Sequence, residues 1–184
     1  MTTSGLNTGK GSIATTLPTT PPTTAPPPTA PPANTGVYPM STTVTVPETT
    51  SGISSATVFS YTPNAQSTMP QYDTPSAGYT YGVVDAQECA GPGGAGSGAD
   101  AYDFSILLSN GSTASSPTYL TGVPTNLPSE SELGSGNTAL TQGQCDRGWV
   151  VFNIPDGVTA TYVEFTGNTA GDNPNSTAKW TVAG

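Results

Sequence analysis

The stretch GQCDRGWVVFNIP, residues 143–155, contains the only arginine of the chain, Arg147, two positions after one of its two cysteines, Cys145. A guanidinium presents a planar fork of hydrogen-bond donors that matches a carboxylate. We therefore expect Arg147 to lie where a strand begins, near the cysteine, and to contact a carboxylate or carbonyl oxygens. Anion binding is the alternative, but no second basic residue stands nearby in the sequence to share an anion.

The two cysteines, Cys89 and Cys145, each stand at the edge of an expected strand. This placement predicts a disulfide, which would close a long loop and stabilise the fold by roughly 4 kcal/mol in the chain-entropy model. A disulfide in turn indicates an oxidising compartment outside the cytosol. Two buried free thiols are the alternative. Zinc is not expected, because the chain has no histidine and two cysteines cannot complete a tetrahedral site.

Carboxylates gather around the glycine-rich segment GPGGAGSG, residues 91–98. Asp85 and Glu88 precede it, and Asp100 and Asp103 follow it. Oxygen ligands of this kind suit Ca²⁺, but the spacing of a calcium-binding loop is absent. We interpret these residues as a solvated acidic rim and predict no metal ligand. The glycine-rich segment is not followed by Lys-Ser or Lys-Thr, so it is expected to be a loop between strands rather than a phosphate-binding loop.

A further pair of carboxylates, Glu130 and Glu132, lies in the segment PSESEL. Paired carboxylates can hydrolyse glycosidic bonds, but acids in a polar loop are usually only solvated. The absence of histidine excludes Ser-His-Asp and Cys-His arrangements. We therefore predict that the protein is not an enzyme and that it has no catalytic residue and no cofactor.

The charge balance limits the partners of this chain. Its net charge is −9 and it has only three basic residues, Lys10, Arg147 and Lys179, so binding to nucleic acid or to an anionic lipid surface is not expected. No run of about 18 apolar residues is present, so no membrane span is expected. The N-terminus lacks the basic start and apolar core of a signal peptide. Either the chain is not exported by that route, or a signal has been removed.

The elements that must position these residues are short strands. From residue 37 onward, runs rich in β-branched and aromatic residues alternate with Gly, Pro, Asn and Ser, and no helical periodicity is present. Seven or eight strands predict an all-β, antiparallel sandwich over residues 37–184. Tyr102, Phe104 and Ile106 are expected on one face of one strand. The expected core or near-core residues are Trp149, Phe152, Tyr162, Phe165 and Trp180.

Residues 1–36 differ from the rest, because they are rich in Thr, Pro and Ala and have almost no apolar bulk. Such a tract cannot fold alone and favours an extended polyproline II conformation. We interpret it as a linker or arm. Its few apolar side chains, Leu6, Ile13 and Leu17, are the residues through which it would contact partner subunits.

Several segments together resemble a known family: GYTYGVVDAQECAG, YDFSILLSNGS, GQCDRGWVVFNIP and the final KWTV. They are similar to the immunoglobulin-like domain of unknown function in secreted proteins and lipoproteins of actinobacteria, over about residues 55–184. The most specific block combines Cys145, Arg147 and Trp149 with Phe152 and an exit proline. The resemblance implies an extracytoplasmic, non-enzymatic, immunoglobulin-like sandwich with bridged cysteines. Family members often stand on a Thr/Pro-rich stalk after a lipidated cysteine, which is missing here.

Two functions fit these features. The preferred hypothesis is a structural protein outside a large assembly, specifically a capsid-decorating or minor virion protein of an actinobacteriophage. A virion protein needs no export signal, and an arm could lie across neighbouring subunits, such as a capsid protein, while the sandwich projects outward. The alternative is a stalked cell-envelope or secreted binding protein of an actinobacterium. A surface rich in Thr, Ser and Asn also makes a host-surface glycan a candidate partner.

Overall fold

The computed structural model describes Met1 and residues 36–46, 52–93, 98–125, 127, 131–136, 139–167 and 177–182. The predicted arm, with Leu6, Ile13 and Leu17, therefore lies outside the described residues, as do Glu130 and residues 94–97 of the glycine-rich segment. No helix in the described part is long and apolar enough to cross a membrane.

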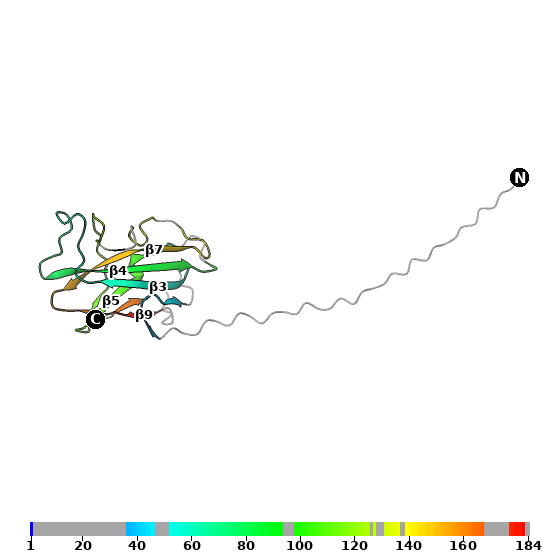
Figure 1. Ribbon diagram of the computed structural model, residues 1–184. Helices are drawn as coiled ribbons and strands as arrows, with labels where there is room; N and C mark the ends of the chain where they lie inside the picture. The colour runs from blue at the N-terminus through cyan, green and yellow to red at the C-terminus, as the bar shows by residue number, and fades with distance from the viewer. Residues whose placement is uncertain are drawn as a thin grey trace.

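Two β-sheets face each other, which confirms the prediction of an all-β sandwich (Figure 1). One sheet has the order β1-β9-β8-β5-β6, formed by Val37–Tyr38, Ala178–Thr181, Ala160–Phe165, Phe104–Leu108 and Thr113–Ala114. The other has the order β2-β3-β4-β7, formed by Thr43–Thr45, Ile53–Thr62, Tyr79–Ala90 and Cys145–Pro155. These strands pair antiparallel, except that β1 runs parallel to β9. A short 3-10 turn, η1 (Ala101–Asp103), precedes β5.

The inner faces of the two sheets form the main core. Because side chains alternate along a strand, β4 and β7 send every second residue inward. Val84 and Phe152 belong to this inner set, and β9 adds Trp180 from the opposite sheet. The Trp180 side chain is fully buried, and its indole nitrogen donates a hydrogen bond to the Thr42 carbonyl over 2.9 Å.

One aromatic residue does not lie where the alternation placed it. Tyr102 belongs to η1 and is 53% exposed, because β5 begins only at Phe104. The prediction that Tyr102 shares a strand face with Phe104 is therefore wrong. Tyr162, expected in or near the core, is half-buried in β8. Phe104 and Phe165 do pack together in the core, with ring centroids 5.4 Å apart.

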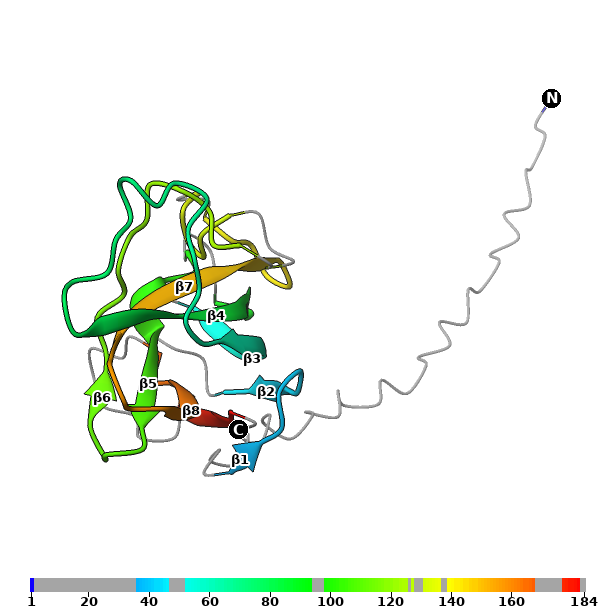
Figure 2. The ribbon, with the colours of Figure 1, turned by 60° about the vertical axis from the view of Figure 1, so that its left-hand side comes forward.

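The outer face of β4 and β7 is also apolar, because a layer of loops covers it (Figure 2). Tyr81, Val83 and Trp149 on this face form a second buried cluster with Val151 and Ala65. Trp149 is thus buried on the outer face of its strand, whereas Phe152 is buried on the inner face. The sheet carrying β7 therefore has a covering on each side, which explains why VVFNI is a continuous apolar run apart from one asparagine.

Asp73 ties this loop layer together. It accepts hydrogen bonds from the Ser67 hydroxyl and from the backbone amides of Thr121 and Gly122, both at 2.7 Å. We call these four residues the Asp73 knot. Burial alone would raise the pKa of Asp73, but these hydrogen bonds outweigh it and lower the pKa below its ordinary value. The knot joins loop segments almost fifty residues apart, which are also connected by hydrogen bonds between their backbones.

The edges of both sheets are short or covered. β7 borders its sheet, but the Thr118 amide donates to the Val151 carbonyl, and the Leu133 amide to the Trp149 carbonyl. The other border strands, β1, β2 and β6, have only two or three residues each. Exposed, long strand edges invite pairing with other chains. In the described part of this sandwich the border strands are therefore short or, for β7, covered by loop segments.

Candidate functional site

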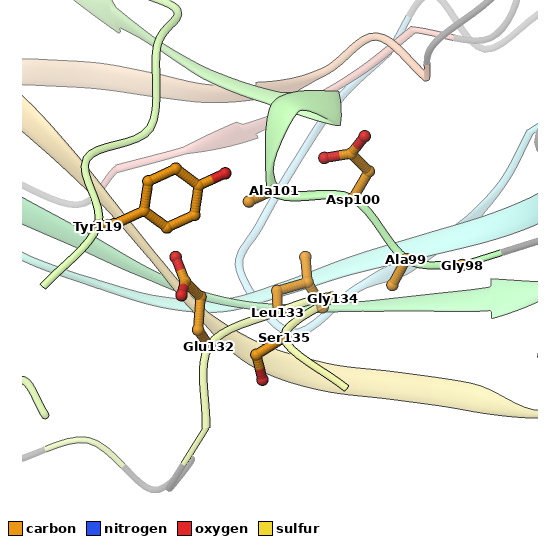
Figure 3. A pocket seen from close by; sticks show the side chains of 9 residues that line it. All are labelled: Gly98, Ala99, Asp100, Ala101, Tyr119, Glu132, Leu133, Gly134 and Ser135. Carbon is orange, nitrogen blue, oxygen red and sulfur yellow. The ribbon is translucent and has the colours of Figure 1, made fainter. Parts of the chain in front are cut away.

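A cavity of about 360 Å³ opens at the end of the sandwich where η1 begins (Figure 3). Three parts of the chain form its wall: residues 98–101, Tyr119, and residues 132–135. Its walls carry the carboxylates of Asp100 and Glu132 and the phenol of Tyr119. A cavity of this size, with a few polar groups in one place, suits a small ligand or one side chain of a partner.

Two glycines allow these segments to approach each other. A Cβ atom on Gly148, in β7, would lie 2.2 Å from the Leu133 amide nitrogen, so only glycine lets residues 131–135 lie directly on the strand. Gly134 has a φ of +76°, and a Cβ there would lie 2.4 Å from the Ala99 carbonyl oxygen. The glycine of the Arg-Gly-Trp sequence in β7 is thus required structurally, because a side chain there would displace residues 131–135, which form one wall of the cavity.

The opposite wall is held by a capping interaction. Asp100 precedes η1 in an extended conformation, and its carboxylate accepts a hydrogen bond from the Tyr102 amide over 2.9 Å. The Asp100 amide in turn donates to the Glu88 carboxylate over 3.0 Å. Glu88, on β4, therefore lies directly behind the wall that Asp100 forms.

Glu132 and Tyr119 lie on the side of the cavity facing Asp100. Figure 3 shows the Glu132 carboxylate extending towards the Tyr119 ring. Burial raises the pKa of Glu132, and its buried Oε1 atom accepts no hydrogen bond from the described residues. A buried carboxylate oxygen without a donor is costly, and no donor among the described residues offsets the negative charge at this atom.

Tyr119, which lines the cavity, packs near a second exposed tyrosine, Tyr102. Tyr119 and Tyr102 are 60% and 53% exposed, and their ring centroids are 6.5 Å apart at an angle of 56°. Their hydrogen bond, helped by partial burial and by the charges of Glu132 and Asp100, raises the pKa of Tyr119 to about 12. The Tyr119 phenol therefore remains neutral at physiological pH. Both residues present aromatic surface together with a hydroxyl group.

A group of carboxyls extends from this wall into the protein. We call Glu88, Asp100, Asp103 and Asp146 the acidic corner. Glu88 shares the inward-facing set of β4 with Val84, pairs in register with Asp146 on β7, and is fully buried, as is Asp103. Burial first, and the charge of Asp103 second, raise the pKa of Glu88 well above its ordinary value of 4.5. The hydrogen bond from the Asp100 amide opposes this rise without cancelling it.

The basic side chains of the described residues are engaged elsewhere. Arg147 forms a forked contact with Asp85, through Nε at 3.1 Å and Nη2 at 2.7 Å, and its guanidinium lies 3.7 Å from the centre of the Phe59 ring. Lys179 pairs with Glu164 at 3.0 Å. Neither neutralises the acidic corner. The carboxylate expected beside Arg147 is thus Asp85, on the neighbouring strand.

The structure divides the four acids that the sequence placed around the glycine-rich segment. Glu88, Asp100 and Asp103 come together, whereas Asp85 faces the outer side of the sheet and pairs with Arg147. No group of three or more acidic or cysteine side chains within the described ranges is arranged to hold a metal ion. The expectation of a solvated rim is wrong for Asp85, Glu88 and Asp103, because all three are buried.

The cysteine prediction is confirmed: Cys89 and Cys145 form a disulfide between paired positions of β4 and β7. It closes a separation of 56 residues and lies next to Glu88 and Asp146. The disulfide therefore fixes the two strand ends that carry half of the acidic corner. It also indicates that the protein matures in an oxidising compartment.

Sequence reasoning missed Tyr119, Asp146 and Asp73. Asp146 stands beside Cys145, and the pairing of the two cysteines would have placed it opposite Glu88. Tyr119 and Asp73 lie in long loops, where neither periodicity nor motif spacing gave a signal.

No protein-family profile and no curated protein matches this chain. Among solved structures, the putative lipoprotein YcdA from Bacillus subtilis is similar with a TM-score of 0.46 and 14% sequence identity. The similarity covers 76% of this chain and 38% of that protein, so the chain spans well under half of its length.

Proposed function

We propose that this protein is an extracytoplasmic, non-enzymatic structural and interaction module displayed on the outside of a large assembly. In this proposal residues 1–36 anchor the chain to partner subunits and the sandwich projects outward. The observation that carries the proposal is a disulfide-closed sandwich whose sheet edges are short or covered. A module displayed in many copies at high local density must avoid pairing with its neighbours through strand edges.

We further propose that the sandwich is immunoglobulin-like. If β3, β4 and β7 are taken as strands A, B and E, then β5, β6, β8 and β9 correspond to C, C′, F and G, in the sheet orders typical of that fold. Strand D would pair with the free edge of β7. Here that edge is covered by segments around Thr118 and Leu133. Both segments lie between β6 and β7, which is where strand D would come in the chain.

One feature departs from the immunoglobulin pattern. The disulfide of antibody domains joins strands B and F across the two sheets, whereas Cys89 and Cys145 join β4 and β7 within one sheet. This disulfide leaves the space between the sheets to apolar side chains and pins one end of the sandwich. Support for the immunoglobulin-like assignment thus comes from strand order and not from the cysteines.

The assembly we propose first is the particle of an actinobacteriophage, with this chain as a decorating or minor virion protein. The anchored alternative is the cell envelope of an actinobacterium, for which an exported, disulfide-closed domain on a Thr/Pro-rich stalk is equally well suited. The two differ in what the N-terminal tract holds on to, a protein shell or the envelope.

Sedimentation of the native protein from its source, in high salt and mild detergent, tests this proposal. Co-migration with a megadalton particle at fixed stoichiometry is the expected result. Recovery with detergent-solubilised envelope would support the stalked alternative. Recovery as a small free species from every fraction would contradict display on a large assembly and leave a secreted binding protein as the alternative.

A further inference from the structure

The charged side chains that line the cavity at η1 are all negative. Glu132 and Asp100 lie on its walls, and the buried Glu88 lies directly behind Asp100. The Oε1 atoms of both glutamates are buried and accept no hydrogen bond within the described part of the chain. The described basic side chains, Arg147 and Lys179, are paired with other carboxylates.

We propose that this cavity binds a cationic side chain, a lysine or an arginine, presented by a protein partner. The inference rests on the proposed function, because it supplies the chemistry by which the displayed sandwich contacts another protein. The ammonium or guanidinium group would donate to the Glu132 carboxylate. Its apolar stem would pack along the Tyr119 ring, as long cationic side chains do on aromatic surfaces.

Charge complementarity favours a cation over other ligands. The carboxylates of Asp100 and Glu132 line one recess. Like charges beside low-dielectric walls produce a negative potential that attracts cations and repels phosphates or carboxylates. Desolvation on binding strengthens the attraction between the cation and Glu132. The net charge of −9 strengthens this preference over longer distances.

The arrangement favours an organic cation over a metal ion. No metal-binding group of three acidic or cysteine side chains exists among the residues described here. Glu88, the most buried carboxyl, lies behind the backbone of Asp100 rather than on the cavity surface. The cavity volume of about 360 Å³ suits the end of a long side chain. One small ion would leave most of this volume empty.

The test is a titration of the isotopically labelled full chain with a hexalysine peptide, followed by NMR. The matched control peptide has every lysine side chain acetylated and therefore neutral. We expect hexalysine to shift the amide signals of Ala99, Ala101 and Gly134, and the acetylated peptide to leave them unchanged. Signals from the Asp73 knot, on the loop layer, should not move.

Two variants separate a specific site from general attraction to an acidic protein. Glu132→Gln and Asp156→Asn each remove one negative charge, but Asp156 is exposed in the turn after β7, away from the cavity. We expect Glu132→Gln to weaken hexalysine binding by about tenfold, the loss typical of one charged hydrogen bond. Asp156→Asn should change it by less than about twofold, as for a screened surface charge.

Several outcomes would overturn the proposal. Equal effects of the two variants would show only non-specific attraction. Shifts at the cavity with Ca²⁺ or with a neutral oligosaccharide, but none with hexalysine, would assign the cavity to a metal or to a glycan. These results leave the sedimentation result unaffected, so co-migration with a particle together with absent hexalysine binding would overturn this inference alone.

Discussion

The Asp73 knot and the acidic corner both contain buried carboxyls, Asp73 in one and Glu88 and Asp103 in the other, and they differ in what surrounds them. Asp73 accepts hydrogen bonds from a hydroxyl and two backbone amides. Glu88 accepts one hydrogen bond from a backbone amide and lies among carboxyls of like sign. The pKa of Asp73 is accordingly lowered, whereas the pKa of Glu88 is raised.

This difference separates a carboxyl that holds loops together from one whose position costs stability. The donors around Asp73 come from two distant loop segments, so its charge stabilises their association. The neighbours of Glu88 repel its charge, and no basic side chain in the described ranges compensates for it. Natural proteins retain such groups mainly where they serve binding or specificity.

Removing the disulfide should have the largest effect on global stability, and local opening of the folded protein should concentrate at the acidic corner. Cys89→Ser combined with Cys145→Ser frees the strand ends that carry Glu88 and Asp146. For a separation of 56 residues the chain-entropy model predicts a loss of about 4 kcal/mol in the free energy of unfolding. Urea denaturation would measure this loss, and hydrogen exchange should show opening at residues 98–103 while the Asp73 knot remains protected. Equal opening of the acidic corner and the Asp73 knot would contradict the prediction that the disulfide acts mainly on the corner.

Asp73→Asn tests the knot. The amide nitrogen of asparagine would face hydrogen-bond donors, so we expect the thermal midpoint at pH 7 to fall by several degrees. Because the pKa of Asp73 is lowered from 3.8, the stabilisation by its charge exists above that pH and is lost as the pH falls further. The variant and the wild type should therefore converge in strong acid. A difference that persists there would indicate that packing, not charge, explains the loss.

Glu88→Gln should have the opposite sign. Because the pKa of Glu88 is raised above 4.5, its contribution to stability is complete below that pH and declines as the pH rises towards its folded-state pKa. Glutamine remains neutral, so the variant should become the more stable protein at pH 8, by about 1 to 3 kcal/mol. Denaturation at pH 4 and pH 8 would measure the change. A variant less stable at pH 8 would mean that the wild-type carboxylate is held by a favourable partner.

Arg147→Lys should have the smallest effect. It tests a third kind of carboxyl, Asp85, which is as buried as Glu88 but has a forked cationic partner. Lysine keeps the charge and loses the fork and the planar contact with Phe59. We expect a loss of about 1 kcal/mol, because the arginine side chain is 38% exposed and solvent screens part of the interaction. A larger loss than that of the disulfide variant would contradict this ranking.

Much of the frame was predictable from the sequence. Alternation and turn residues predicted the sandwich, and the two cysteines at strand edges predicted the disulfide. Alternation along Tyr79–Ala90 also places Glu88 on the face of Val84, a signal that it is buried. The sequence does not reveal which distant segments meet. The lowered pKa of Asp73 depends on the amides of Thr121 and Gly122, which are distant in sequence. The cavity depends on the close approach of residues 131–135 to β7, which Gly148 permits. Tyr102 was misplaced because η1 interrupts the pattern just before β5.

Asp73 and Glu88 differ in the direction of their pKa shifts. Carboxyl-carbon NMR of the labelled wild-type protein measures both pKa values in one titration. We predict that the Asp73 signal titrates below 3.8 and the Glu88 signal well above 4.5. Signals assigned through Asp73→Asn and Glu88→Gln would identify each group. If Glu88 titrated at or below its ordinary value, the acidic corner would contain a compensating partner, and the contrast between the two regions would be wrong.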